Sequence, residues 1–105
     1  MEISGIQNKV AEFVRDNNLE TAPEIRLLDL ISEIGELNKE FLQGSDYGKN
    51  DLAAGREWAL ELGDVFFSLL CVANSTDVDM GEALQSVLSK YNKRIDERGE
   101  AGSAN

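Results

Sequence analysis

The segment that most constrains this chain is residues 57–73, EWALELGDVFFSLLCVA. On a helix, with about 100° per residue, its apolar side chains cover most of the circumference, which is typical of a buried helix. Glu57, Glu61, Asp64 and Ser68 nevertheless lie above one another on one narrow line, because they are spaced i, i+4, i+7 and i+11. Buried carboxylates are strongly destabilising unless they are paired, protonated or bound to a metal. The fold must therefore supply a partner for this acidic line.

The apolar pattern of the whole chain predicts an all-α protein with one domain, because long periodic stretches are interrupted by few breaks. Its 105 residues suffice for one core. Asp79 followed by Glu82 has the spacing of a helix capping box, and Pro23 suits the first turn of a helix. We expect four helices, at about residues 3–18, 23–43, 56–74 and 80–98.

Residues 1–98 are expected to form this single helical domain and residues 99–105 a flexible tail, because the tail is rich in small side chains. The polar loop 44–55 is long for a connection between bundle helices, which is often a sign of function. The start of the chain has neither the basic nor the apolar region of a signal peptide, and no uninterrupted apolar run approaches membrane-spanning length. We therefore expect a soluble, cytoplasmic protein.

Charge and composition exclude several classes of function. The chain has 20 acidic and 10 basic residues, a net charge of −10, which disfavours binding to nucleic acids or anionic membranes. An acidic surface favours cations, although it also serves solubility. Histidine is absent, so a metal site must use oxygen ligands. Cys71, the one cysteine, cannot form an intrachain disulfide and is expected to be a buried thiol.

Two expected helices each carry an acidic pair at i, i+3, formed by Glu33 with Glu36 and by Glu61 with Asp64. Such a pair directs both carboxylates into the same space. If the two helices are antiparallel neighbours, four carboxylates converge and repel one another unless a cation binds. Oxygen ligands of this kind suit Mg²⁺, or alternatively Mn²⁺, far better than Zn²⁺.

Each of these features also has a purely structural explanation. The acidic stripe of residues 29–40 is compatible with a solvated helix face, and the acids of residues 57–64 could pair with Arg26 or Arg56. Lys90 and Arg94 are spaced i, i+4, as a phosphate clamp requires. Cations near the C-terminus of a helix equally complement its dipole.

Three motifs resemble those of a known family. SEIGEL at 32–37 followed by ELGDV at 61–65 resembles the ExxE…ExxD signature of the MazG-type all-α nucleoside triphosphate pyrophosphohydrolases, and KYNKR at 90–94 resembles the K-aromatic-x-x-R stretch of their last helix. The resemblance covers about residues 20–98. Family members often have two consecutive acids at the start of the first motif, where this chain has Ser32.

The resemblance implies a four-helix, MazG-like bundle that cleaves a nucleoside triphosphate to the monophosphate and pyrophosphate. It implies that Mg²⁺ is held by an acidic quartet and that two cations bind the phosphate chain. It also implies a homodimer or homotetramer, and the all-round apolarity of residues 57–73 independently favours such an assembly. The residues that the resemblance assigns are Glu33, Glu36, Glu61 and Asp64 for the metal and catalysis, and Lys90 and Arg94 for the substrate.

Two other functions remain open at this stage. A phosphoribosyl-ATP pyrophosphatase shares the acidic signature and the reaction. A catalytically silent helical oligomerisation module would retain the acids without using them. A di-iron carboxylate bundle is disfavoured, because its Glu-x-x-His motif requires histidine, which this chain lacks.

Overall fold

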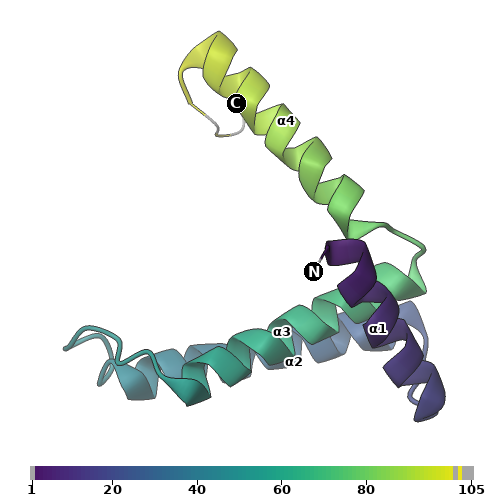
Figure 1. Ribbon diagram of the computed structural model, residues 1–105. Coiled ribbons are helices and arrows are strands. Elements are labelled where there is room, and N and C mark those ends of the chain that lie inside the picture. Colours follow the sequence, from purple (N-terminus) through teal and green to yellow (C-terminus); the bar gives the residue numbers. More distant parts are fainter. Residues whose placement is uncertain (1, 101, 103–105) are drawn as a thin grey trace.

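The computed structural model describes residues 2–100 and 102 and consists, within that range, of four helices and no strand (Figure 1). The prediction of an all-α fold is confirmed, and each helix boundary lies within two residues of its expected position. The expected flexible tail lies mostly outside the described residues. The helices are α1 (Ile3–Asp16), α2 (Pro23–Gly44), α3 (Arg56–Ser75) and α4 (Met80–Arg98).

Local sequence signals account for the helix ends. Asn18 adopts a left-handed conformation (φ 56°) just beyond α1, which asparagine tolerates better than most residues. Pro23 occupies the first position of α2, where its missing N–H costs nothing. The side chain of Asp79 accepts a hydrogen bond from the backbone N–H of Glu82 (3.0 Å), as the capping spacing predicts. Gly99, with φ 76°, ends α4.

Helices α2 and α3 lie side by side as an antiparallel hairpin, which forms the largest contact between elements (Figure 1). Helix α1 packs against the C-terminal half of α3, where the rings of Phe13 and Phe67 meet edge to face with centroids 6.0 Å apart. The most deeply buried apolar residues, Leu70, Cys71 and Ala73, lie in this half of α3. The core of one chain is therefore small and sits at one end of the hairpin.

A buried glutamine joins α1 to the start of α4. The Nε2 of Gln7 donates to the Oδ1 of Asn74 (3.1 Å) and to the carbonyl of Val78 (2.6 Å), and its Oε1 accepts from the backbone N–H of Met80 (2.9 Å). The Nδ2 of Asn74 donates in return to the carbonyl of Gln7 (3.1 Å). Since Gln7 is only 6% exposed, these bonds fix the direction in which α4 leaves the hairpin.

Helix α4 rises away from the hairpin, and its substantial contact in the described chain is with α1 (Figure 1). The radius of gyration is 16.8 Å, against about 13 Å for a compact domain of this length. Many large apolar side chains are consequently exposed. Helix α3 is also long and apolar enough to span a membrane, by length and composition alone.

The loop 44–55 closes the hairpin and is compact. The hydroxyl of Ser45 donates to the carbonyl of Phe41 (2.7 Å) and accepts from the backbone N–H of Gly48 (3.0 Å). Gly48 has a φ of 82°, which other residues rarely adopt. The loop therefore holds α2 and α3 in register at their far ends, which places the acidic residues of the two helices opposite each other.

Candidate metal centre

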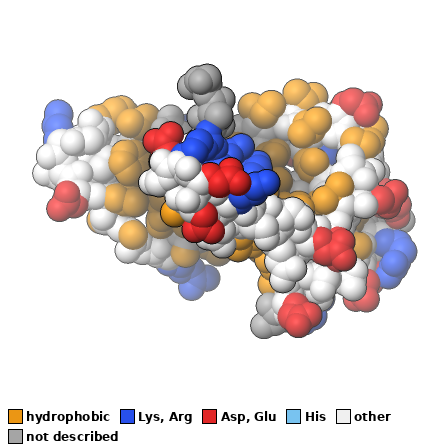
Figure 2. Space-filling view, turned by 90° about the horizontal axis from the view of Figure 1, so that it is seen from above, with side chains coloured by type: hydrophobic (Ala, Val, Ile, Leu, Met, Phe, Trp, Pro, Cys, Tyr) orange, Lys and Arg blue, Asp and Glu red, His pale blue; other side chains and the backbone are white. Residues whose placement is uncertain are grey.

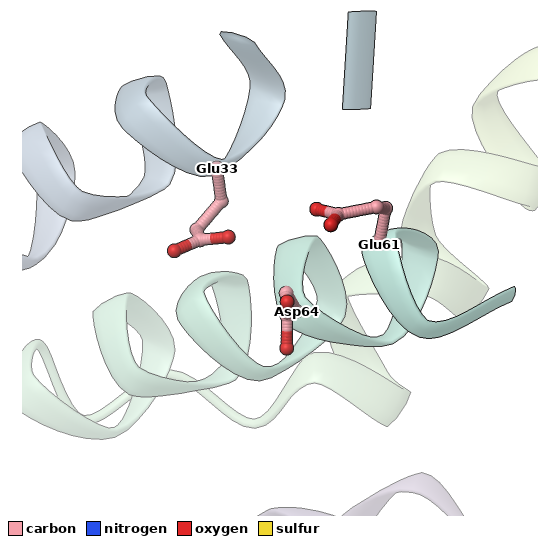
Figure 3. A group of neighbouring side chains, drawn as sticks. All are labelled: Glu33, Glu61 and Asp64. Atoms are coloured by element: carbon pink, nitrogen blue, oxygen red, sulfur yellow. The ribbon is translucent and has the colours of Figure 1, made fainter. Parts of the chain in front are cut away.

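Three carboxylates from two helices converge near the middle of the hairpin. Helix α2 supplies Glu33, and α3 supplies Glu61 and Asp64 from adjacent turns. One oxygen from each residue lies within 4.8 Å of the others. Figure 3 shows Glu33 pointing from α2 towards α3, and Glu61 pointing back towards α2. The antiparallel pairing of two i, i+3 acidic motifs produces this convergence.

The electrostatics of the cluster are those of mutually repelling acids. Glu33 and Glu61 are partly buried, and Asp64 is exposed. Desolvation raises the pKa of Glu61 above the ordinary value of 4.5, and the charges of Asp64, Glu33, Glu36 and Glu40 raise it further. This repulsion favours the binding of a cation.

Neither arginine that the sequence offered as a structural partner neutralises the cluster. Arg26 is buried, donates to the carbonyl of Leu19 and pairs with Asp29 at 3.9 Å. Arg56, at the start of α3, forms no ion pair with any residue of the described chain. The structural explanation of the α3 acids therefore loses its proposed partners.

Glu36 stands outside the three-residue cluster. It is exposed, and its carboxylate is not among the oxygens that converge within 4.8 Å, although its charge still acts on Glu61. Glu57, one turn before Glu61, is exposed and likewise outside the cluster. The assignment of Glu36 as the fourth ligand remains a prediction.

Within one chain, the expected phosphate-binding cations lie on α4, whereas the acids lie on the α2–α3 hairpin. Lys90 and Arg94 flank the ring of Tyr91 on α4, with the Lys90 Nζ 5.4 Å and the Arg94 guanidinium carbon 5.7 Å from its centroid. They are about 15 Å and 21 Å along α4 from Met80, at a rise of about 1.5 Å per residue. Helix α4 diverges from the hairpin over this length (Figure 1).

A cavity of about 370 Å³ opens on the hairpin near the C-terminus of α3, and the sequence did not reveal it. Arg26 and Cys71, two of its lining residues, lie seven positions from Glu33 and Asp64, which is about 10 Å along each helix. Burial raises the pKa of the Cys71 thiol, in agreement with its expected structural role. The cavity is lined by residues of α1, α2, α3 and the segment between α1 and α2, so no single sequence motif indicates it.

The donor chemistry of the cluster fits a hard divalent cation. All three converging groups are carboxylates, which Mg²⁺ and Mn²⁺ prefer, and the site is open enough for water to complete the coordination. The fold and the cluster together define an all-α protein with an oxygen-ligand cation site between two antiparallel helices.

Comparison with known proteins identifies the family. Residues 21–99, which make up most of the chain, match the MazG nucleotide pyrophosphohydrolase domain. The chain therefore belongs to this family. The matched range contains the hairpin, the acidic cluster and α4, so the resemblance drawn from the motifs is confirmed.

Individual relatives agree with this assignment. YpjD, an uncharacterized protein of Bacillus subtilis, is 35% identical over 80 residues, which are 73% of this chain and 70% of YpjD. The crystal structure of YpjD superposes with a TM-score of 0.74 at 32% identity, covering 90% of this chain and 96% of that one. The Bacillus-conserved MazG protein, a nucleotide pyrophosphohydrolase, gives a TM-score of 0.76 at 29% identity, covering 93% and 97%.

Proposed function

We propose that this protein is a Mg²⁺-dependent nucleoside triphosphate pyrophosphohydrolase. It cleaves the bond between the α- and β-phosphates and releases the nucleoside monophosphate and pyrophosphate. The observation that carries the proposal is the convergence of Glu33, Glu61 and Asp64 within 4.8 Å, in a chain of the MazG nucleotide pyrophosphohydrolase family. Such a site accommodates the metal that a triphosphate needs for charge neutralisation.

The residues of the acidic cluster have two roles in the proposed reaction, metal binding and proton transfer. Glu33, Glu61 and Asp64, with Glu36 at the edge, would hold Mg²⁺, or Mn²⁺ in its place. When bound there, the ion would neutralise phosphate charge and lower the pKa of water. One carboxylate of the site would accept the proton of the attacking water, because the chain has no histidine to act as the base.

The partners of the protein follow from the same features. Lys90 and Arg94 bind the phosphate chain of a small-molecule substrate, and the acidic net charge favours neither nucleic acid nor a membrane surface. We assign the exposed apolar surface of α3 to a contact between subunits of a homodimer or homotetramer. A membrane-spanning role is disfavoured, because Glu61 and Asp64 would place two carboxylates within the membrane. A soluble, cytoplasmic protein fits this assignment.

A substrate panel tests the proposed function. Canonical and damaged nucleoside triphosphates, together with phosphoribosyl-ATP, are assayed for pyrophosphate release in Mg²⁺. We expect release from simple triphosphates by the wild type and none by Asp64→Asn, with Asp96→Asn on exposed α4 surface as the matched control. If phosphoribosyl-ATP is the only compound turned over, the protein is instead a phosphoribosyl-ATP pyrophosphatase. A lack of turnover across the panel would favour the silent oligomerisation module.

A further inference from the structure

Helix α1, which lies wholly within the described residues, has one fully buried residue, and that residue is polar. Gln7 lies on the apolar stripe of the helix with Val10 and Val14, at the spacing i, i+3, i+7. An apolar side chain at this position would add to the core without needing a partner, whereas a buried amide is costly unless it is hydrogen-bonded. Only 6% of Gln7 is exposed. Its amide therefore has a role that hydrophobic packing alone does not supply.

The amide of Gln7 is bonded at the point from which α4 starts. Its Nε2 donates to the side chain of Asn74, at the end of α3, and to the carbonyl of Val78 in the turn. Its Oε1 accepts from the backbone N–H of Met80, the first residue of α4. This N–H is one of the four that a helix leaves without an internal partner, and the neighbouring Asp79 side chain serves a later one. Gln7 is thus a capping group for α4 that another helix supplies.

Helix α1 also approaches the first turn of α4 at a glycine. A Cβ on Gly81 would lie 3.2 Å from the Oδ1 of Asp79 and 3.9 Å from the Cβ of Ile3. The first distance is shorter than an ordinary van der Waals contact, so a side chain here would press on the carboxylate that caps α4. Since the substantial contact of α4 in the described chain is with α1, the angle of α4 depends on this junction.

A small change of angle at the junction is amplified along α4. Lys90 and Arg94 lie about 15 Å and 21 Å from Met80, so a turn of about 5° about Met80 displaces them by about 1.3 Å and 1.8 Å. Hydrogen bonds from a cation to a phosphate oxygen have donor–acceptor distances of about 2.7–2.9 Å, so displacements of this size are large for them. Seen from the side towards which α4 rises, lysine and arginine side chains gather on its C-terminal part (Figure 2). Their position therefore depends on the angle at which α4 starts.

We propose that Gln7 is a positioning residue for the phosphate-binding cations of α4. The hydrogen bonds of its amide hold α4 at one angle, and this angle determines where Lys90 and Arg94 meet the phosphate chain of a substrate. The amide gives up the stability of an apolar residue in exchange for a defined direction of the helix. The role of Gln7 rests on the proposed function in one respect, the binding of phosphate by Lys90 and Arg94, and it does not depend on hydrolysis.

A double-mutant cycle separates this role from a merely structural one. Binding of inorganic triphosphate with Mg²⁺ is titrated by phosphorus NMR in the wild type and in Gln7→Met, which is similar in size but has no amide. Both titrations are repeated in the Lys90→Ala/Arg94→Ala background. We expect Gln7→Met to weaken binding about 10-fold or more, as for the loss of one hydrogen bond to a charged group. In the background without the two cations, it should weaken binding less than about twofold. Equal weakening in both backgrounds, or none in the wild type, would overturn the proposal.

A distance measurement tests the angle of α4 itself. Spin labels are attached through Lys39→Cys on α2 and Ser89→Cys on α4, both exposed positions, with one doubly labelled subunit per oligomer. The Cys71 thiol stays in place, because its burial and raised pKa keep it from reacting with the label. Gln7→Met should shift or broaden the distribution of distances, and Asn8→Ala, an exposed neighbour on α1, should leave it unchanged. An unchanged distribution in Gln7→Met overturns the proposal, even where the background without the cations binds too weakly to titrate.

The remaining outcomes separate the positioning role from folding and from the proposed function. If Gln7→Met does not fold, Asn74→Ala removes only the two bonds between Asn74 and Gln7, and it should show a smaller effect in the same direction. The same effect of Asn74→Ala in both backgrounds would overturn the positioning role. A wild type that binds triphosphate but hydrolyses no nucleotide refutes the proposed function, while the cycle still decides for or against Gln7. A wild type that binds no triphosphate overturns the positioning role.

Discussion

Helix α4 has an exposed apolar face formed by Leu84, Leu88, Tyr91 and Ile95, and if this face contacts a second copy in the proposed homo-oligomer, Leu88→Ala has a quantitative consequence. Leu88 is 52% exposed in one chain, so a second copy can still remove about half of its surface from water. Since full burial of a leucine is worth about 1.5–3 kcal/mol, half of it is worth about 1 kcal/mol. A two-fold dimer contains the residue twice, so the substitution should weaken the dimer by about 2 kcal/mol, or about 30-fold in its dissociation constant. Alanine is the best helix former, so α4 itself is not weakened.

Sedimentation velocity over a dilution series measures the dissociation constant of the Leu88→Ala dimer. Ser89→Ala, on the polar side of the same helix, is the matched control and should leave the constant within about twofold of wild type. If the wild type remains associated at every dilution, the same difference should appear in the free energy of urea unfolding, which for an obligate dimer includes association. Equal constants for the two variants would refute the assignment of this face to a subunit contact.

Three further perturbations have expected outcomes. Asp64→Asn removes one of the three converging carboxylates, so pyrophosphate release should be lost. Because it also relieves charge repulsion, the melting temperature of the metal-free protein should rise. The control Asp96→Asn should leave the melting temperature unchanged, and the same result for Asp64→Asn would contradict the repulsion. Burial, and after it the neighbouring acids, raise the pKa of Glu61 in the folded chain. Protonation of Glu61 therefore stabilises the metal-free fold at low pH, and this stabilisation is lost as the pH rises through the raised pKa. In EDTA, Glu61→Gln should make the free energy of urea unfolding depend less on pH between neutral pH and 4.5. Gln7→Ala leaves buried groups unpaired and should cost about 1–3 kcal/mol of unfolding free energy, whereas exposed Asn8→Ala should cost little.

Much of the fold could be predicted from sequence because its signals are local. Pro23, the capping pair of Asp79 and Glu82, and the apolar periodicity each act within one or two helical turns, and they fixed the helix boundaries to within two residues. The acidic cluster was also accessible, since two i, i+3 pairs on antiparallel neighbours must face each other. Glu33, Glu61 and Asp64 converge for this reason.

Features that depend on distant parts of the chain could not be predicted. The direction of α4 is set by Gln7 and Asn74, which are 67 residues apart, and nothing in the sequence near either residue indicates their contact. The cavity beside Arg26 likewise needs several segments to converge. The position of Glu36 outside the cluster depends on the exact rotation of α2 against α3, which periodicity defines only coarsely.

The most direct test of the central claim is the identity of the products. Wild-type protein is incubated with Mg²⁺ and a nucleoside triphosphate that it turns over, and the products are quantified together by anion-exchange chromatography. We predict equal amounts of nucleoside monophosphate and pyrophosphate, with no turnover once EDTA removes the metal. Release of orthophosphate with a nucleoside diphosphate, or undiminished turnover in EDTA, would contradict the assignment of the Glu33, Glu61 and Asp64 cluster as the metal centre of a pyrophosphohydrolase.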